Sequence, residues 1–246
     1  MKMKKLFFLI FFFTLLLIGC SNQAPIIVQE ETNVDDEDIN LIEQESEDEE
    51  EVQRILEFTL PMQQISLHLD QIPILNNYLA KHQNRKQAIE QMELTRVIDS
   101  EELDKVAPLF VLSFACVDNT CSYLLLNTET ERSKLLADNA TLKSINISPD
   151  EDKLLLVFER PGESELWTKQ KIIVFDLNTW NALSLNTIDE TNFQLHQFLW
   201  PIIEVNWQDN KTITVTLPAV NEPTDEQLNT WYELSQNTQE VQVTFD

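Results

Sequence analysis

Residues 108–129 read PLFVLSFACVDNTCSYLLLNTE, and this stretch decides which fold we expect. It contains two apolar runs of strand length, PLFVLSFAC (108–116) and CSYLLLNTE (121–129). The short polar loop Val117-Asp118-Asn119-Thr120 separates them. Apolar runs on either side of a polar turn predict two strands joined as a hairpin, and we expect them to pair antiparallel.

Similar runs follow this hairpin. Between residues 141 and 186 they are TLKSINIS, KLLLVFER, KIIVFDLN and ALSLN, and after residue 201 they are IIEVNW, TITVTLP and VQVTF. Turn residues such as Pro161-Gly162 separate the runs. Short apolar runs separated by turn residues are typical of an antiparallel sheet. Thr224, with Gln227 three residues later, resembles a capping box and predicts a helix before the last strand.

The segment before the hairpin has a different pattern. Pro73 can begin a helix, and Lys81–Glu93 is rich in helix formers. We therefore expect a mainly β (α+β) protein with a helical segment over 58–107 and one C-terminal helix. The rest of 108–246 is expected to form an antiparallel β-sheet meander, a sandwich or an incomplete propeller-like sheet.

Two segments, ISPDEDKLLLVFE (147–159) and KQKIIVFDLNTWNALSL (169–185), resemble one blade of a TolB-like or WD-repeat propeller. In those blades a Ser-Pro-Asp turn leads into an apolar strand, and a strand ending in Asp-Leu-x-Thr leads into the outer strand. Closed propellers usually have at least four blades, and the strands of this chain suffice for fewer. We therefore expect an open sheet.

The first twenty residues, MKMKKLFFLIFFFTLLLIGC, have the pattern of an export signal: a basic start followed by an apolar run over 6–18. As a helix this run would rise only about 20 Å, less than the roughly 30 Å of bilayer hydrocarbon. Residues 1–19 are therefore predicted to be a signal peptide and not a permanent membrane span.

The end of this segment, Leu17-Ile18-Gly19-Cys20, resembles the lipobox of bacterial lipoproteins. The resemblance implies cleavage between Gly19 and Cys20. It also implies a diacylglyceryl group on the Cys20 thiol, so that acyl chains such as palmitate would anchor the mature N-terminus in the membrane. Abundant Asn, Gln, Ile and Lys are typical of low-GC Gram-positive proteins, which suggests that source.

Residues 20–57 are predicted to be the lipidated N-terminus and an acidic tether. Gln29–Glu57 contains 14 acidic residues and one basic residue. Such a run buries too little apolar area to offset its ordering entropy, so we expect it to be disordered. A calcium loop of the EF-hand kind is not expected, because Leu41 stands where the sharp turn requires Gly.

The composition excludes several classes of function. The 246 residues include 42 Asp and Glu but only 17 Lys and Arg, for a net charge of -25. A surface this acidic repels nucleic acid, so no nucleic-acid partner is expected. The two glycines are Gly19 and Gly162. Gly-rich phosphate loops, dinucleotide fingerprints and Gly-x-Ser-x-Gly elbows are therefore excluded.

Two cysteines, Cys116 and Cys121, remain once Cys20 is assigned to the lipid anchor, and they face each other across the predicted hairpin. On an exported protein we expect them to form a disulfide. A redox-active pair is disfavoured, because thioredoxin-like chemistry uses Cys-x-x-Cys at the start of a helix. A metal site is disfavoured too, since no second thiol pair or histidine pair accompanies them.

Other polar residues carry little sign of catalysis. His68 and His196 lie among apolar residues, where a partly buried imidazole is the common role. Asp150, Asp152 and Asp176 are explained by turns and strand ends. No nucleophile motif accompanies any of them, so no catalytic residue, metal or cofactor is predicted.

The five tryptophans could line a binding groove. Trp207 follows the alternation of a strand, so we expect it in the core. Trp167 and Trp180 border loops and are the candidate binding residues, with rings expected near solvent.

These observations favour a non-catalytic, lipid-anchored module on the extracytoplasmic face of a cell membrane. It would bind a protein or a cell-wall component of the envelope. A solute- or carbohydrate-binding lipoprotein is the alternative. An envelope enzyme without a visible motif comes third, because catalytic groups can converge from distant positions.

Overall fold

The computed structural model describes residues 54–60, 63–97, 108–162, 164–188 and 193–246. All of them belong to one compact unit of the chain, which begins at residue 50. The predicted signal peptide, its cleavage site at Gly19 and Cys20, and the acidic tether before residue 54 lie outside the described residues.

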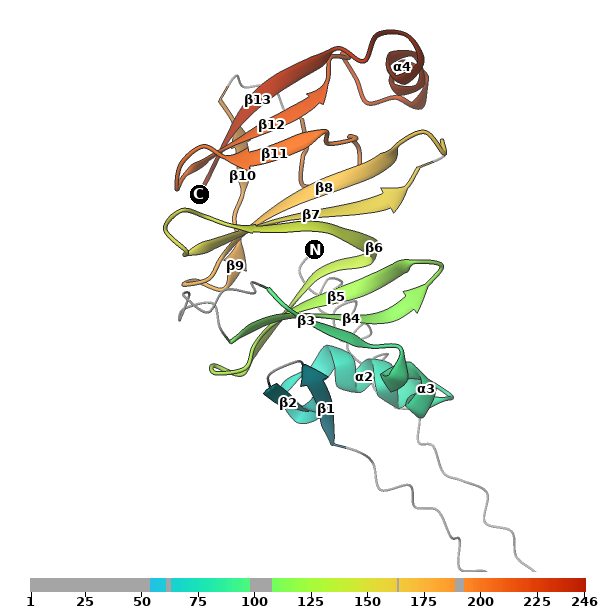
Figure 1. The fold of residues 1–246 in the computed structure, drawn as a ribbon, viewed down its shortest axis with the longest axis vertical. Coiled ribbons are helices and arrows are strands. Elements are labelled where there is room, and N and C mark those ends of the chain that lie inside the picture. The colour runs from blue at the N-terminus through green and yellow to red at the C-terminus, as the bar shows by residue number, and fades with distance from the viewer. Residues whose placement is uncertain (1–53, 61–62, 98–107, 163, 189–192) are drawn as a thin grey trace, which may run out of the picture. The chain divides into compact units, whose positions relative to one another are not determined.

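Beside a two-stranded hairpin, this unit contains three stacked antiparallel layers of strands, which we call the first, second and third sheets (Figure 1). The first and second sheets are the two halves of one seven-stranded sheet, and the third is a separate four-stranded sheet. The first sheet consists of β3 (Glu93–Arg96), β4 (Leu109–Val117), β5 (Thr120–Asn127) and the first part of β6 (Arg132–Ile147). The second sheet consists of the rest of β6, β7 (Lys153–Pro161), β8 (Thr168–Asp176) and β9 (Asn181–Ala182). The third sheet has the order β10 (Leu185–Thr187), β13 (Thr238–Phe245), β12 (Thr212–Pro218) and β11 (Glu204–Trp207). The expected mainly β fold with antiparallel sheets is confirmed.

Strand β6 belongs to two sheets. Its first part, Arg132–Ala140, pairs with β5, and its second part, Thr141–Ile147, pairs with β7. Register shifts interrupt both pairings, and Asn139, within the shift opposite β5, has a positive φ of 46°. Bulges bend a strand and increase its twist, which lets β6 leave the first sheet and enter the second.

A hydrophobic core fills each space between neighbouring layers. The first core joins the first sheet to a layer of helices and a hairpin, the second core joins the first and second sheets, and the third core joins the second and third sheets. The central strands of the first and second sheets are therefore buried on both faces. This explains why LFVL and LLLVF are uninterrupted apolar runs, since both sides of these strands face apolar neighbours.

The layer that covers the first sheet contains the hairpin β1 (Ile55–Leu60) and β2 (Gln63–His68), the 3₁₀ turn η2 (Leu69–Gln71) and the helices α2 (Pro73–Lys81) and α3 (Arg85–Glu90). The two helices lie where the sequence predicted them. The helical segment predicted over 58–107 also contains strands, because β1, β2 and β3 include residues of this segment.

The predicted boundary of the tether at residue 57 is wrong as well. Strand β1 begins at Ile55, and Leu56 is only 1% exposed in the first core. The apolar Leu56 gains burial where β1 pairs with β2, which outweighs the acidic character of the segment before it.

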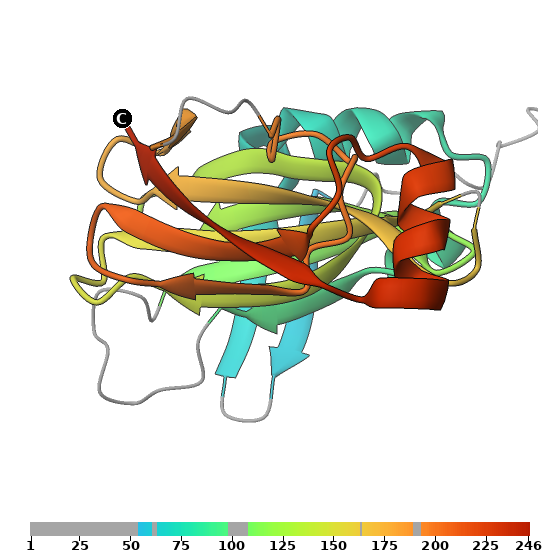
Figure 2. The ribbon, with the colours of Figure 1, turned by 90° about the horizontal axis from the view of Figure 1, so that it is seen from above.

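Helix α4 (Asp225–Thr230), continued by the π-helical turn η3 (Trp231–Ser235), is the expected C-terminal helix. The Thr224 hydroxyl accepts a hydrogen bond from the backbone N–H of Gln227 at 3.3 Å, as the capping pattern predicted. In Figure 2 the helix lies beside the third sheet and leaves the outer side of that sheet uncovered. None of the described helices is long and apolar enough to cross a membrane.

The predicted β4–β5 hairpin and its disulfide are confirmed. Asp118 and Asn119 form a two-residue turn, and both have positive φ, at 47° and 68°. Positive φ at both central residues is the geometry of the tight turns whose twist matches that of paired strands. Just before and after this turn the sulfur atoms of Cys116 and Cys121 lie 2.07 Å apart. The disulfide thus holds the register of the two strands next to a bulge in β4.

Candidate functional site

The two tryptophans predicted near solvent are buried. Trp167 is 6% exposed, and its Nε1 donates a hydrogen bond to Asn229 Oδ1 at 2.9 Å. Trp180 is 9% exposed and packs edge-on against Phe175 in the second core, with ring centroids 5.3 Å apart. The expectation of exposed aromatic anchors is wrong, because a ring beside a loop in sequence can still turn inward where two apolar layers meet.

Trp207, expected in the core, lies at the edge of the third core and is half-buried. Its ring packs edge-on against Phe245 at a centroid distance of 5.7 Å. Strand β11 is an outer strand of the third sheet, so a side chain on it has core neighbours on one side only.

The histidines do not form a site. His68, His82 and His196 are all exposed, so the expectation of partly buried imidazoles is wrong for His68 and His196. Within the described residues, no group of three or more His, Cys, Asp or Glu side chains could hold a metal ion.

Asp150 takes part in the turn between β6 and β7. Its carboxylate accepts hydrogen bonds from the Ser148 hydroxyl at 2.5 Å and from Lys153 Nζ at 3.0 Å. Burial alone would raise the pKa of Asp150, but these bonds, the N–H of Asp152 and the Lys153 charge outweigh it and hold the pKa below its usual value. Asp176 likewise accepts from the backbone N–H of Thr179 at 2.7 Å, which closes the turn after β8. The interpretation of these carboxylates as turn residues is confirmed.

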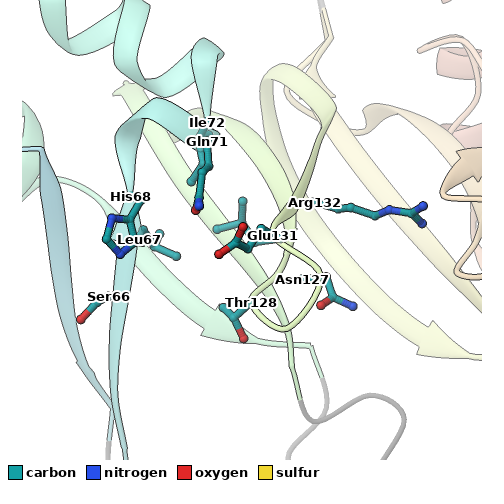
Figure 3. Close-up of a pocket in the computed structure, with 10 residues that line it drawn as sticks. Ser66, Leu67, His68, Gln71, Ile72, Asn127, Thr128, Glu131 and Arg132 are labelled. Carbon is teal, nitrogen blue, oxygen red and sulfur yellow. The ribbon is translucent and has the colours of Figure 1, made fainter.

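A small pocket lies between η2 and the β5–β6 turn (Figure 3). The side chains of His68, Gln71 and Glu131 point toward this space, whereas Arg132 points away from it. The cavity has a volume of about 60 Å³. This space holds a few water molecules but not a metabolite, for which pockets of roughly 300–1,000 Å³ are usual.

Two cations meet on the β7–β8 hairpin, and we call Arg160 and Lys171 the cation pair. Register places Phe158 opposite Lys171 and Arg160 opposite Lys169, so the pair lies diagonally on one face of the second sheet. The Phe198 ring, from the loop after the third sheet's first strand, lies against both cations. Its centroid is 4.0 Å from Arg160 Cζ and 5.1 Å from Lys171 Nζ.

Backbone carbonyls of β6 hold the cation pair in place. Arg160 donates from Nε to Asn139 O at 2.9 Å and from Nη2 to Asp138 O at 2.5 Å. Lys171 Nζ donates to Leu136 O at 3.1 Å. Burial lowers the pKa of the Lys171 amino group, and the positive charge of Arg160 lowers it further.

The outer side of the third sheet carries mainly polar side chains, and we call it the open face. The alternation of β12 directs Ile213, Val215 and Leu217 into the third core and the intervening threonines outward. The pairing registers place these outward residues in three rows: Glu204, Thr216 and Glu240; Asn206, Thr214 and Gln242; Thr212, Thr244 and Asn186. The open face therefore presents hydroxyl, amide and carboxylate groups but no Lys or Arg.

Sequence reasoning missed both features. The alternation in TITVTLP and VQVTF contained the signal for the open face, because period-two patterns indicate a sheet with one solvated side. The cation pair draws on β6, β7, β8 and the loop at Phe198, and no local pattern brings those four segments together.

Comparisons with known proteins add no family to these observations. No protein-family model matches the chain. No curated protein and no solved structure matches it either.

Proposed function

We propose that this chain is a non-catalytic module, anchored by lipid at Cys20 to the extracytoplasmic face of a cell membrane, which binds a cell-wall glycan through its open face. The single observation that carries the proposal is the contrast between the two outer layers of the stack. The first sheet is covered by β1, β2, α2 and α3, whereas the third sheet has no covering layer among the described residues.

The chemistry of the open face suits an uncharged, hydroxyl-rich ligand. The hydroxyls of Thr214 and Thr216 and the amide of Gln242 make no side-chain hydrogen bond within the described part of the chain. Hydroxyl and amide groups can both donate and accept, as sugar hydroxyls and acetamido groups require. Glu204 and Glu240 disfavour anionic polymers, because like charges repel.

The order of the layers supports display of this face. The described chain begins at Arg54, whose carbonyl accepts a hydrogen bond from the N–H of Leu69, in the layer beyond the first sheet. The open face belongs to the last layer, with the first and second sheets between them. An anchor that precedes β1 would join the domain at the layer farthest in the stack from the open face.

Binding to purified cell-wall glycan tests the proposal. We expect the variant Asn206→Ala, Thr214→Ala, Gln242→Ala to bind glycan at least about tenfold more weakly, because it loses several hydrogen bonds. Its unfolding midpoint should stay close to that of the wild type. Asn77→Ala, on the exposed side of α2, is the control and should bind normally. Equal binding by the triple variant would contradict the proposal.

The anchor requires its own test. Cys20→Ser should release the protein into the medium or leave it unprocessed, since the lipid could no longer be attached. Membrane retention of a normally cleaved Cys20→Ser protein would show that the assignment of the lipobox is wrong. This test leaves the glycan-binding result unaffected.

A further inference from the structure

The cation pair stands out in an acidic domain. From residue 58 to 246 the chain has 28 acidic and 13 basic residues. Acidic side chains are thus available to pair with most cations, as Glu90 does with Lys86 and Asp225 does with Lys169. Within the described residues, however, no carboxylate lies within ion-pair distance of Arg160 or Lys171.

Two acidic residues adjoin Arg160, Asp138 through its backbone carbonyl and Glu159 in sequence, and their carboxylates contact other groups. The Asp138 carboxylate accepts a hydrogen bond from the Ser122 hydroxyl, although its backbone carbonyl contacts Arg160. Glu159 lies 4.0 Å from Lys143 and accepts from the Thr168 hydroxyl at 3.0 Å. No carboxylate of the described residues therefore pairs with either positive charge of the cation pair.

Toward the described part of the chain, both cations keep free donors. Arg160 uses two of its five N–H groups on carbonyls of β6, and Lys171 uses one of its three on Leu136. The carbonyls and the Phe198 ring fix the positions of both groups before any ligand arrives. A fixed site loses little side-chain entropy on binding, which favours affinity.

We propose that Arg160 and Lys171, held in position by the Phe198 ring, bind a compact oxyanion, a carboxylate or phosphate group. The anion accepts from the free guanidinium and ammonium donors and neutralises the repulsion between them. Its source is a small solute, because the surrounding acidic surface repels long anionic polymers. This site is distinct from the open face and does not depend on the proposed glycan binding.

Titration of the full-length protein with sodium phosphate and, separately, sodium acetate tests this proposal. Ionic strength is held constant with sodium chloride, since screening alone changes charged interactions. We expect one or both anions to raise the melting temperature and to give a saturable calorimetric signal. Phosphate alone would identify a phosphate-bearing solute, and acetate alone a carboxylate-bearing one. No response to either anion overturns the proposal.

Variants locate the site. Lys171→Gln and Arg160→Gln should each weaken anion affinity about tenfold or more, because each removes charged hydrogen bonds. Lys86→Gln removes one positive charge from an exposed position on α3 and should leave anion affinity unchanged. If Arg160→Gln fails to fold, Lys171→Gln still decides the outcome. Equal affinity in Lys171→Gln and Lys86→Gln would overturn the assignment.

A spectroscopic measurement separates ligand binding from a purely structural role. Nitrogen-detected titration of the Lys171 ammonium by NMR should show its pKa rising when phosphate is present, since a bound anion favours the charged form. If the two cations serve only to satisfy the carbonyls of β6, phosphate leaves that pKa unchanged, and the proposal fails.

Discussion

The second and third sheets each have four strands, yet their central strands are built differently. In β7 the five residues 154–158, LLLVF, are all buried, whereas in β12 the residues 213–217, ITVTL, alternate between buried and half-buried. The second sheet lies between two cores, and the third sheet borders only one. Uninterrupted apolar runs thus mark a sheet inside the stack, and alternation marks the sheet that ends it.

A pair of substitutions gives the most sensitive test of this difference between the two sheets. Phe158 is fully buried in the second core, so Phe158→Ala should cost about 3–5 kcal/mol of unfolding free energy. Thr214→Ala, on the open face, should change it by no more than about 0.5 kcal/mol. Urea unfolding of both variants measures the difference. Similar losses in the two would mean that the third sheet is covered on its outer side.

The next largest effect distinguishes two tryptophans. Trp167→Ala should cost about 3 kcal/mol, because it empties a buried site and removes the hydrogen bond to Asn229. Trp207→Ala should cost less, since its ring is half-buried at the edge of the third core. Thermal unfolding of the two variants ranks them, and the reverse order would contradict the burial described here.

Removing the disulfide of the first sheet should have a smaller effect on the unfolding free energy. Replacing both Cys116 and Cys121 by Ser should lower the unfolding free energy by about 2 kcal/mol, because the bond closes only a short loop of the unfolded chain. Chemical denaturation under oxidising conditions measures this loss. The same loss should appear in the wild type after reduction, and no change on reduction would count against the bond.

The smallest predicted effect is a gain in stability. Glu151, in the turn between β6 and β7, has a φ of 60°, a conformation that costs a residue with a Cβ about 1 kcal/mol. Glu151→Gly should therefore stabilise the protein by up to about 1 kcal/mol. Asn210→Gly is the matched control in the β11–β12 turn, where no residue from 208 to 211 has a positive φ. A gain in stability for Asn210→Gly but not for Glu151→Gly would contradict this prediction.

Local patterns predicted much of this fold. The apolar runs and turns predicted β4, β5, β7, β8, β12 and β13, and the capping pattern predicted α4. They failed for the first part of β6, where ERSKLLADNA has several charged residues and no regular alternation. That segment is a strand because β5 offers it a partner, and tertiary pairing of this kind overrides local preference.

The candidate sites were less predictable than the strands. The burial of Trp167 depends on Asn229, which lies 62 residues away in sequence. The cation pair likewise depends on Phe198 and on carbonyls near the bend of β6. Spacing in the sequence predicts which residues are neighbours within one helix or strand. Both of these sites instead form between segments that are far apart in sequence.

The position of β10 has a consequence for the order of folding. Strand β10 pairs only with β13, and their registered residues Asn186 and Thr244 are separated by more than fifty positions along the chain. Contacts between such distant segments close a long loop, and chains rich in them fold slowly. In a chain that is synthesised progressively, β10 must therefore stay unpaired until residues 238–245 are present. The third sheet should accordingly be the last to acquire protection against amide hydrogen exchange during refolding.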